Sequence, residues 1–211
     1  MRQTLPGFLL VLLLLSGCAG LGPQPAEDRE AAVAAYRERA GILSKLEQWR
    51  LMGRVSVRGP QESGQVRVRW TGDARGGHIQ VRNPFGQTVM EVRRGGQGLR
   101  VRNARGEVYR GWRARAVLRR QLGWQVPFGP MARWALGLAR GKRIPETLDD
   151  RGRPLTLKSG PWRVTYGEYR KVDGVWLPVD LRVTREDVEL HLRVDQWHLQ
   201  QDADPAKGRS A

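Results

Sequence analysis

Apolar and polar side chains alternate with a period of two along most of this chain from residue 49 onward. That spacing puts every second side chain on the same face, as in a β-strand and not in a helix. The apolar positions are Leu51, Val55 and Val57; Val66, Val68 and Trp70; Ile79 and Val81; Trp162, Val164 and Tyr166; Val175, Leu177, Val179, Leu181 and Val183; and Val188, Leu190, Leu192 and Val194. Because Gly- and Asn-rich turns separate these short runs, the sequence predicts an antiparallel meander with one apolar face.

Two turns and one irregularity of this sheet can be placed from the sequence. Gly95–Gly98 and Asn103–Gly106 have the composition of hairpin turns. Near the C-terminus the alternation changes phase at Asp195-Gln196, after which Trp197 and Leu199 are the apolar positions. A change of phase within one strand predicts a β-bulge.

Three other segments have apolar residues at helical spacing. The face of the first consists of Val33, Tyr36, Ala40 and Leu43, that of the second of Ala114, Val117, Leu118 and Leu122, and that of the third of Met131, Trp134 and Leu138. Asp28 is a suitable cap for a helix over residues 29–46, and the Pro- and Gly-rich run Gly123–Pro130 separates the other two. The predicted fold is mainly β with helices (α+β), a single curved antiparallel sheet with three helices against its apolar face. Periodicity does not decide whether the sheet closes into a barrel or stays open with the helices as a lid.

The N-terminus has the three parts of a secretory signal peptide. Arg2 precedes the apolar run Phe8–Leu15, and the small residues Ser16 and Gly17 follow directly. A membrane-spanning helix would need about 20 apolar residues, far more than this run offers. Leu15-Ser16-Gly17-Cys18 is similar to the lipobox of bacterial lipoproteins. That resemblance implies cleavage before Cys18, a diacylglycerol thioether on its sulfur and a third acyl chain on its amine.

Cys18 is the only cysteine in the chain, so no intramolecular disulfide can form. Acyl chains contribute roughly 0.8 kcal/mol per buried CH₂, so several chains on one residue anchor it stably in a membrane. Ala19 stands where an Asp retains many Gram-negative lipoproteins in the inner membrane, and it indicates the outer membrane, facing the periplasm. The predicted organisation is a signal peptide over residues 1–17, a lipidated flexible tether over 18–28, a folded domain over 29–200 and a polar tail over 201–211.

The chain is strongly basic, with a formal net charge of +16 and a pI near 11.3. Such a charge is typical of proteins that bind nucleic acid, but export argues against nucleic acid as the partner. The basic residues are spread along the predicted strands, as Arg67, Arg69, Arg82, Arg100, Arg102 and Arg193 show. A solvated strand face explains them most simply, and attraction to anionic headgroups or to an acidic partner surface is the alternative.

The sequence has no constellation of catalytic or metal-binding residues. Its three histidines, His78, His191 and His198, have no metal-ligand spacing, and no GxSxG motif is present. Asp149-Asp150 and Glu186-Asp187 are acidic pairs in predicted loops, where turn formation and solvation explain them. We therefore expect a protein that is not an enzyme and needs neither a cofactor nor a metal.

Two apolar features are unusual in this hydrophilic chain. The first is its eight tryptophans, most of them on faces predicted to point inward: Trp49, Trp70, Trp112, Trp124, Trp134, Trp162, Trp176 and Trp197. They indicate either a well-packed core or a cavity lined by large apolar groups and suited to acyl chains. The second is Asn83-Pro84-Phe85-Gly86, which fits a type I turn with Phe85 near the tip. There Phe85 either folds back onto the core or contacts something apolar.

Several of these segments, in this order, are similar to the outer-membrane lipoprotein receptor family LolB. They are the lipobox, Trp49–Val57, Val68-Arg69-Trp70, Asn83–Gly86, Trp134–Gly137, Gly160-Pro161-Trp162, Val164-Thr165-Tyr166, Tyr169, Leu177-Pro178 and Trp197, within a resemblance from Cys18 to about Leu199. The resemblance implies an open, incomplete barrel of the LolA/LolB-like type, with helices over a hydrophobic cavity. It also implies acceptance of triacylated lipoproteins from the periplasmic carrier LolA and their delivery to the inner leaflet of the outer membrane, where the lipid on Cys18 anchors the receptor. We expect a monomer.

The resemblance also assigns roles to single residues. Members of this family carry an exposed apolar residue, usually Leu, at the position of Phe85, and it is needed to insert the client into the bilayer; Pro84 and Gly86 belong to the same turn. The acyl-chain cavity residues expected from the alternation are Trp70, Ile79, Val81, Met90, Val92, Leu118, Trp134, Val164 and Leu181, with ordinary core packing as the alternative for each. A lipid-binding lipoprotein without protein cargo, or an interaction protein with a filled core, are the alternative functions.

Replacing the cysteine tests the predicted membrane anchor. The Cys18→Ala chain should be recovered from the soluble periplasmic fraction, because no thiol remains for acylation. Cell fractionation with detection of the protein in each fraction measures this. Persistent recovery of Cys18→Ala with the membranes would contradict the lipobox assignment.

Overall fold

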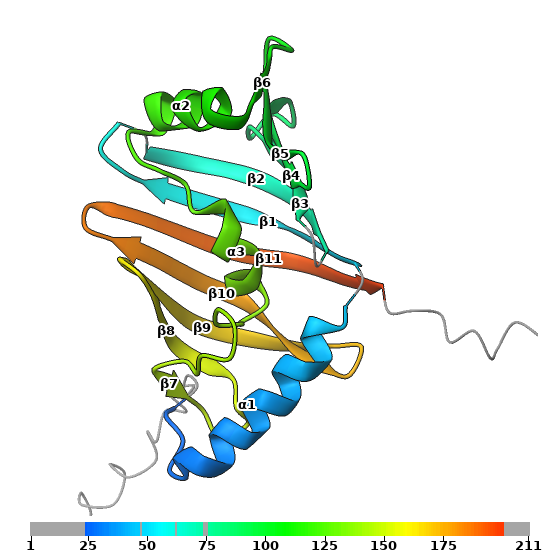
Figure 1. Cartoon of the computed structure of the whole chain (residues 1–211), viewed down its shortest axis with the longest axis vertical. Coiled ribbons are helices and arrows are strands. Elements are labelled where there is room, and N and C mark those ends of the chain that lie inside the picture. The colour runs from blue at the N-terminus through cyan, green and yellow to red at the C-terminus, as the bar shows by residue number, and fades with distance from the viewer. Residues whose placement is uncertain (1–23, 47, 62, 74–75, 201–211) are drawn as a thin grey trace, which may run out of the picture.

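The computed structural model describes residues 24–46, 48–61, 63–73 and 76–200; the predicted signal peptide, Cys18 and polar tail lie outside these ranges. The described chain forms eleven antiparallel strands in one sheet and three helices on its apolar side (Figure 1). The predicted α+β fold with a curved sheet is therefore confirmed. The two edge strands do not pair with each other, so the sheet stays open and the helices lie over it.

The order of elements is α1 (Arg29–Ser44), β1 (Gln48–Arg58), β2 (Ser63–Gly72), β3 (Gly77–Arg82), β4 (Thr88–Gly95), β5 (Gly98–Asn103), β6 (Val108–Arg110), α2 (Gly111–Leu122), α3 (Phe128–Ala135), β7 (Thr147–Leu148), β8 (Pro154–Ser159), β9 (Trp162–Val172), β10 (Val175–Arg185) and β11 (Val188–Gln200). The strand order in the sheet is β6-β5-β4-β3-β2-β1-β11-β10-β9-β8-β7. The first and last strands thus lie together in the middle. The connection that contains α2 and α3 passes from one edge of the sheet to the other, which brings it across the apolar face.

The central β1–β11 pair contains the bulge that the sequence predicts. Met52 pairs with Gln196 and Gly53 pairs with Val194, so Asp195 is the extra residue. A Cβ on Gly53 would collide with the main chain of Arg193, which explains the glycine at this position. After the bulge Trp197 faces the interior and its indole N–H donates to the Pro178 carbonyl at 2.9 Å. The bulge therefore keeps the apolar side chains of β11 on the same face of the sheet before and after Asp195.

The helices form where they are predicted, with small differences at their ends. α1 follows its expected cap, because the Asp28 carboxylate accepts hydrogen bonds from the N–H groups of Glu30 and Ala31. α3 begins at Phe128, inside the run 123–130 that was expected to separate two helices, so that boundary was wrong. Pro130 is accommodated because N–H groups in the first turn have no acceptor within the helix. Within the described residues, no helix is long and apolar enough to cross a bilayer.

The helices cover the apolar face of the sheet in three parts (Figure 1). α3 covers the centre, where Trp134 is 1 % exposed. α2 packs Ala114 and Leu118 against β4 and β5. α1 packs Ala32 and Tyr36 against Leu148 of β7. The predicted tether joins the domain before α1 begins, since the Ala26 N–H donates to the Leu148 carbonyl at 2.8 Å.

Most of the tryptophans are packed against one another in the core. One group consists of Trp49, Trp70 and Trp197, and a second of Trp124, Trp134 and Trp162, with ring centroids 5.3–6.4 Å apart. Trp176 is half-buried beneath the guanidinium groups of Arg151 and Arg153. Trp112 differs from the other seven because it is exposed.

A glycine in the β7–β8 turn controls how closely α1 packs on the domain. Gly152 has a φ of +66°, and a Cβ on it would collide with the main chain of α1 at Tyr36. Gly160 has a similar φ of +60° with open space around it. We expect Gly152→Ala to lower the free energy of unfolding by about 2–4 kcal/mol, because overpacking against α1 adds to the backbone cost.

The matched control is Gly160→Ala, which should lower the free energy of unfolding by only about 1–2 kcal/mol. An alanine there has the cost of a left-handed backbone conformation but meets no neighbouring atoms. Urea denaturation of the two variants and the parent measures the difference. Equal losses for both variants would show that α1 does not rest on this turn.

Candidate functional site

An apolar cavity lies between α3 and the middle of the sheet. It is lined by Val55, Val68, Trp70, Ile79, Leu181, Val183, Leu190 and Leu192 from the strands and by Met131, Trp134 and Ala135 from α3. Its volume is about 70 Å³, well below the roughly 300–1,000 Å³ of typical ligand pockets. Side chains therefore fill most of this space in the present conformation. A large apolar ligand can enter only if α3 moves away from the sheet.

A wider groove adjoins this cavity and reaches the end of α1 at Leu43 and Ser44. The groove has a volume of about 240 Å³ and shares Trp70 and Ile79 with the cavity. Phe128, Gly129 and Arg94 line both this groove and a third hollow of about 370 Å³ beside α2. The three hollows thus lie in series beneath α3 and the segment that precedes it. Only the innermost one has an entirely apolar lining.

The residues predicted to line the acyl-chain cavity fall into three sets. Four of them line the apolar cavity: Trp70, Ile79, Trp134 and Leu181. Val92 lines the groove and Leu118 lines the hollow beside α2. Val164 is wholly buried in the core of the sheet, Val81 packs at its margin, and Met90 packs against the cluster beneath α2.

Seven lining residues were not among those predicted: Val55, Val68, Met131, Ala135, Val183, Leu190 and Leu192. For all but Ala135 the periodicity does mark the inward direction. Periodicity does not show which inward side chains lie beneath α3. That depends on how β1 pairs with β11 and on where α3 begins, and both are set by contacts between residues far apart in the sequence.

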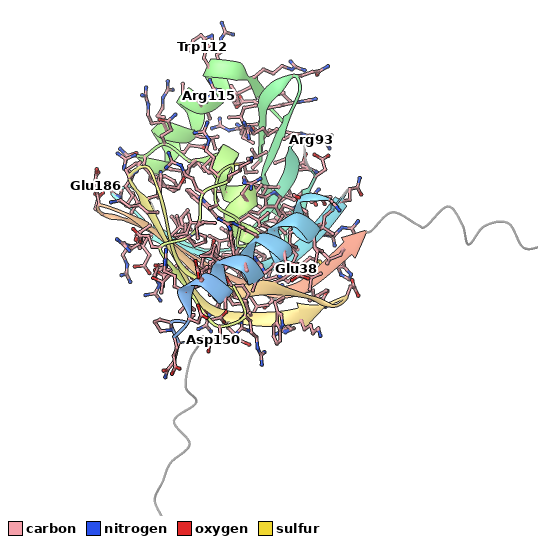
Figure 2. The ribbon with its side chains drawn as sticks, turned by 60° about the horizontal axis from the view of Figure 1, so that its bottom comes forward. Glu38, Arg93, Trp112, Arg115, Asp150 and Glu186 are labelled. Atoms are coloured by element: carbon pink, nitrogen blue, oxygen red, sulfur yellow. The ribbon has the colours of Figure 1, made fainter. Side chains whose placement is uncertain are left out.

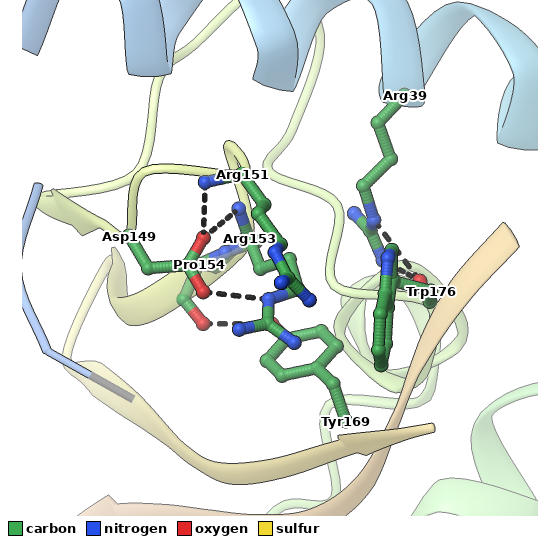
Figure 3. A network of polar contacts seen from close by, with 7 residues as sticks. All are labelled: Arg39, Asp149, Arg151, Arg153, Pro154, Tyr169 and Trp176. Carbon is green, nitrogen blue, oxygen red and sulfur yellow. Dashed lines mark hydrogen bonds and ion pairs between the residues drawn. The ribbon is translucent and has the colours of Figure 1, made fainter. Parts of the chain in front are cut away.

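Arg39 of α1 attaches the segment that follows α3 to the rest of the domain; Figure 3 shows its contact with Trp176. Its guanidinium donates to the carbonyls of Leu136 at 2.7 Å, Gly137 at 3.1 Å and Trp176 at 2.9 Å. Among the described residues it has no carboxylate partner, and it lies 5.7 Å from the ring centroid of Tyr169. Burial lowers the pKa of Arg39 from its ordinary value. One buried cation therefore joins α1, the end of α3 and β10.

A second polar network lies beside Arg39 and shapes the β7–β8 turn (Figure 3). The Asp149 carboxylate accepts the main-chain N–H groups of Arg151 and Arg153 and binds the Arg153 guanidinium at 2.6 Å. The Tyr169 hydroxyl donates to the Pro154 carbonyl at 2.7 Å, and burial raises the pKa of Tyr169 well above its ordinary value. Asp149 thus has a structural role. In the described part of the chain, no group of three or more His, Cys, Asp or Glu could hold a metal ion.

The turn that carries Phe85 is a well-defined hairpin loop. The Gly86 N–H donates to the Asn83 carbonyl at 3.0 Å, and the Asn83 side chain accepts the Gln87 N–H at 3.0 Å. Gly86, the last of the three residues Pro84–Gly86 between the paired Asn83 and Gln87, has a φ of +84°. A three-residue hairpin loop needs such a left-handed conformation at its last residue. Phe85 is 88 % exposed, so it does not fold back onto the core.

A second loop, Asn103–Glu107 between β5 and β6, repeats this geometry. The Gly106 N–H donates to the Asn103 carbonyl at 3.0 Å, and the Asn103 side chain accepts the Glu107 N–H at 3.0 Å. The position equivalent to Phe85 is occupied by Arg105. Because β3 and β5 run in the same direction, the two loops lie at the same end of the sheet. The turn itself therefore does not require a Phe.

The fold and the site together define a class of protein: an open antiparallel half-barrel that carries helices over an apolar hollow. A family model described as "Outer membrane lipoprotein LolB" matches residues 47–197. The chain is 32 % identical over 194 residues to the outer-membrane lipoprotein LolB of Pseudomonas putida, covering 90 % of this chain and 94 % of that protein. It is 26 % identical over 191 residues to the LolB of Tolumonas auensis, with the same two coverages of 90 % and 94 %. The chain belongs to the LolB family.

A solved structure supports the fold. A domain from Vibrio parahaemolyticus, assigned to outer-membrane lipoprotein sorting, matches with a TM-score of 0.51 at 13 % identity and covers 85 % of this chain and 97 % of that one. At this identity the match shows the fold alone. Family membership places the chain among outer-membrane lipoproteins that bind and transport lipoproteins and are not enzymes.

Removing the Arg39 guanidinium tests its role beneath the helices. Arg39→Met should lower the free energy of unfolding by about 2–4 kcal/mol, because buried carbonyls of Leu136, Gly137 and Trp176 lose their donor. Amide hydrogen exchange in α3 should become faster as well. Urea denaturation and exchange mass spectrometry measure the two effects.

The control is Arg37→Met on the exposed side of the same helix, which should change stability by less than about 0.5 kcal/mol. If Arg39→Met behaved like Arg37→Met in both measurements, Arg39 would not hold the end of α3 in place.

Proposed function

We propose that this protein accepts triacylated lipoproteins from the periplasmic carrier LolA and delivers them to the inner leaflet of the outer membrane. Family membership supports the general role, since its LolB relatives match 90 % of the chain. One observation supports the proposed acceptance of acyl chains, namely the wholly apolar cavity between α3 and the sheet. An interior of this kind binds hydrocarbon and offers nothing to a polar ligand.

The reason for such a receptor is the cost of exposing acyl chains to water. Each exposed CH₂ costs roughly 0.8 kcal/mol, so a triacylated protein cannot cross an aqueous compartment unaided. Direct passage from the cavity of a carrier into the cavity of this protein avoids that exposure. The direction of transfer then follows the relative affinities of carrier, receptor and bilayer for the same chains.

The small volume of the cavity makes movement of α3 part of the proposal. α3 is a helix of eight residues without a side-chain cap at its N-terminus, and Phe128 to Arg133 are only half-buried. The groove beside it is already open on the side of Phe128 and Ala132. Displacement of α3 would join the groove to the apolar cavity through Trp70 and Ile79, which line both. The link to α1 through Arg39 limits that displacement.

Delivery requires contact with the membrane, for which two parts of the chain are suited. The lipid on Cys18 would hold the domain through eight residues that end at Ala26, a reach of at most about 29 Å. Phe85 stands out from the sheet on a hairpin that hydrogen bonds hold in shape, so the ring can enter the headgroup region without a change in fold. We propose that Phe85 assists release of the acyl chains into the bilayer.

A transfer assay tests the function. The purified soluble Cys18→Ala chain is mixed with a LolA–lipoprotein complex, and the distribution of the lipoprotein between the two proteins is followed by gel filtration. We expect the lipoprotein to move to this chain. No movement, with retained binding of free fatty acids, would favour a lipid-binding protein without protein cargo.

Substitution of Phe85 tests the release step. Phe85→Glu should accept cargo normally but deliver it to liposomes at least about tenfold more slowly, because a carboxylate resists entry into hydrocarbon. Phe85→Leu should remain active. Arg105→Glu is the matched control, since it places the same carboxylate at the equivalent position of the Asn103–Glu107 loop. With liposomes of phosphatidylcholine alone, where the loss of a positive charge does not matter, it should release cargo at the parental rate. Normal release by Phe85→Glu would refute the role of this loop.

A further inference from the structure

The outward face of α2 combines an exposed tryptophan with several arginines. Trp112 is 71 % exposed, and the Arg113 guanidinium lies 5.5 Å from its ring centroid. Arg119 and Arg120 are exposed from the same side, one or two turns further along, and Arg115 flanks them. The opposite side of α2 packs Ala114 and Leu118 on the sheet. The helix is therefore held in place with its cations and one large aromatic ring turned to solvent.

The stability of α2 does not explain this composition. The helix has no side-chain cap and no acidic residue in its first turn, where Arg113 opposes the positive end of the helix dipole. A tryptophan on an exposed helix face contributes little to folding, since its ring stays in water. Residues that lower the stability of their own helix are expected where the surface they form has a function.

The neighbouring strands carry further arginines, on the face of the sheet that α2 does not cover, since they alternate with Val92, Leu99 and Val101, which pack beneath α2. Arg93 of β4 lies directly opposite Arg100 of β5, and Arg100 lies directly opposite Arg110 of β6, the residue before α2. Like charges in directly opposite positions destabilise a sheet. None of these three arginines, nor any arginine of α2, forms a salt bridge with a described residue. By contrast Arg54 and Arg193, near the sheet centre, pair with Asp195 and Asp180.

The positive surface is local and not a consequence of the net charge alone. Residues 93–120 contain ten arginines and a single acidic residue, Glu107. Figure 2 shows Trp112 and Arg115 at one end of the molecule and the acidic residues Glu38 and Asp150 toward the other. An anionic surface would thus be attracted more strongly to the α2 end than to the α1 end, where acidic and basic residues are mixed.

We propose that the outward face of α2 docks on anionic phospholipid, with Trp112 in the headgroup region and the α2 arginines on lipid phosphates. Tryptophan favours the membrane interface because its ring is apolar and its N–H is polar. Each arginine near an anionic leaflet adds electrostatic attraction, and added salt weakens this attraction. A protein partner would instead be expected to bury the ring among apolar neighbours, and here the Trp112 ring is next to the guanidinium of Arg113.

This docking would add a second attachment, remote from the lipid. The tether joins the domain at Ala26, beside the start of α1, and α2 lies at the other end of the sheet (Figure 1). If the lipid anchor of the proposed function is present, the two attachments would hold the domain lengthwise along the membrane. Binding by α2 itself does not depend on the anchor or on cargo transfer, so it can be tested apart from them.

Vesicle binding tests the inference. The soluble Cys18→Ala chain is sedimented with vesicles of phosphatidylcholine alone or mixed with phosphatidylglycerol. We expect binding to the mixed vesicles only, weakened by added salt. Replacing Arg113, Arg119 and Arg120 together by Gln should weaken it by about tenfold or more, and Trp112→Ala should weaken it severalfold. All four side chains are exposed, so thermal unfolding should stay at the parental temperature.

The matched control replaces Arg140, Lys142 and Arg143 by Gln, which removes the same charge from an exposed loop nearer α1. This variant should bind the mixed vesicles like the parent. Equal weakening by both triple variants would mean that net charge alone drives binding and would overturn the proposal. Unchanged vesicle binding by the α2 variants, with loss of cargo acceptance from LolA, would overturn it in favour of a protein-docking surface.

Discussion

The pairing of β1 with β11 holds the two halves of the domain together. Each half is a meander whose strands pair with their neighbours in sequence, and only this central ladder joins the first half to the last. The ladder is irregular at Asp195, where Gly53 provides the close approach of the two main chains and Arg54 binds the extra carboxylate at 2.8 Å. Because the bulge shifts the register by one residue, Trp197 reaches the core instead of solvent.

A sheet that is assembled in this way and stays open has one apolar face to cover. Three helices cover it, and they do so unequally. α1 and α2 each pack on one end of the sheet through small clusters of their own. α3 lies across the middle, over a cavity of about 70 Å³ that no polar residue lines. α3, the shortest of the three helices, therefore lies over the most apolar region of the sheet. We propose that acyl chains enter where α3 moves away from the sheet.

The arginines of this chain have three different roles, although the sequence presents them alike. Arg39 is buried and supplies hydrogen-bond donors to carbonyls at the end of α3. Arg153 and Arg54 are paired with carboxylates that shape a turn and a bulge. Those of α2 have no acidic partner among the described residues and carry the proposed contact with anionic lipid. Burial and pairing, which separate these roles, follow from the position of each residue in the fold.

The sequence by itself determined six of the strands (β1, β2, β3, β9, β10 and β11), the three helices, the bulge at Asp195 and the turn at Asn83–Gly86. Each of these depends on residues close together in the chain, where side-chain period, glycine and capping residues act directly. The sequence left open whether Phe85 is exposed. Only the tertiary structure decided that α3 starts at Phe128, that the hollow is narrow, that Arg39 is buried and that Trp112 is not. These properties depend on which strands and helices meet across the sheet. A local pattern shows that a side chain points inward, but the neighbours that fill the space around it come from distant parts of the chain.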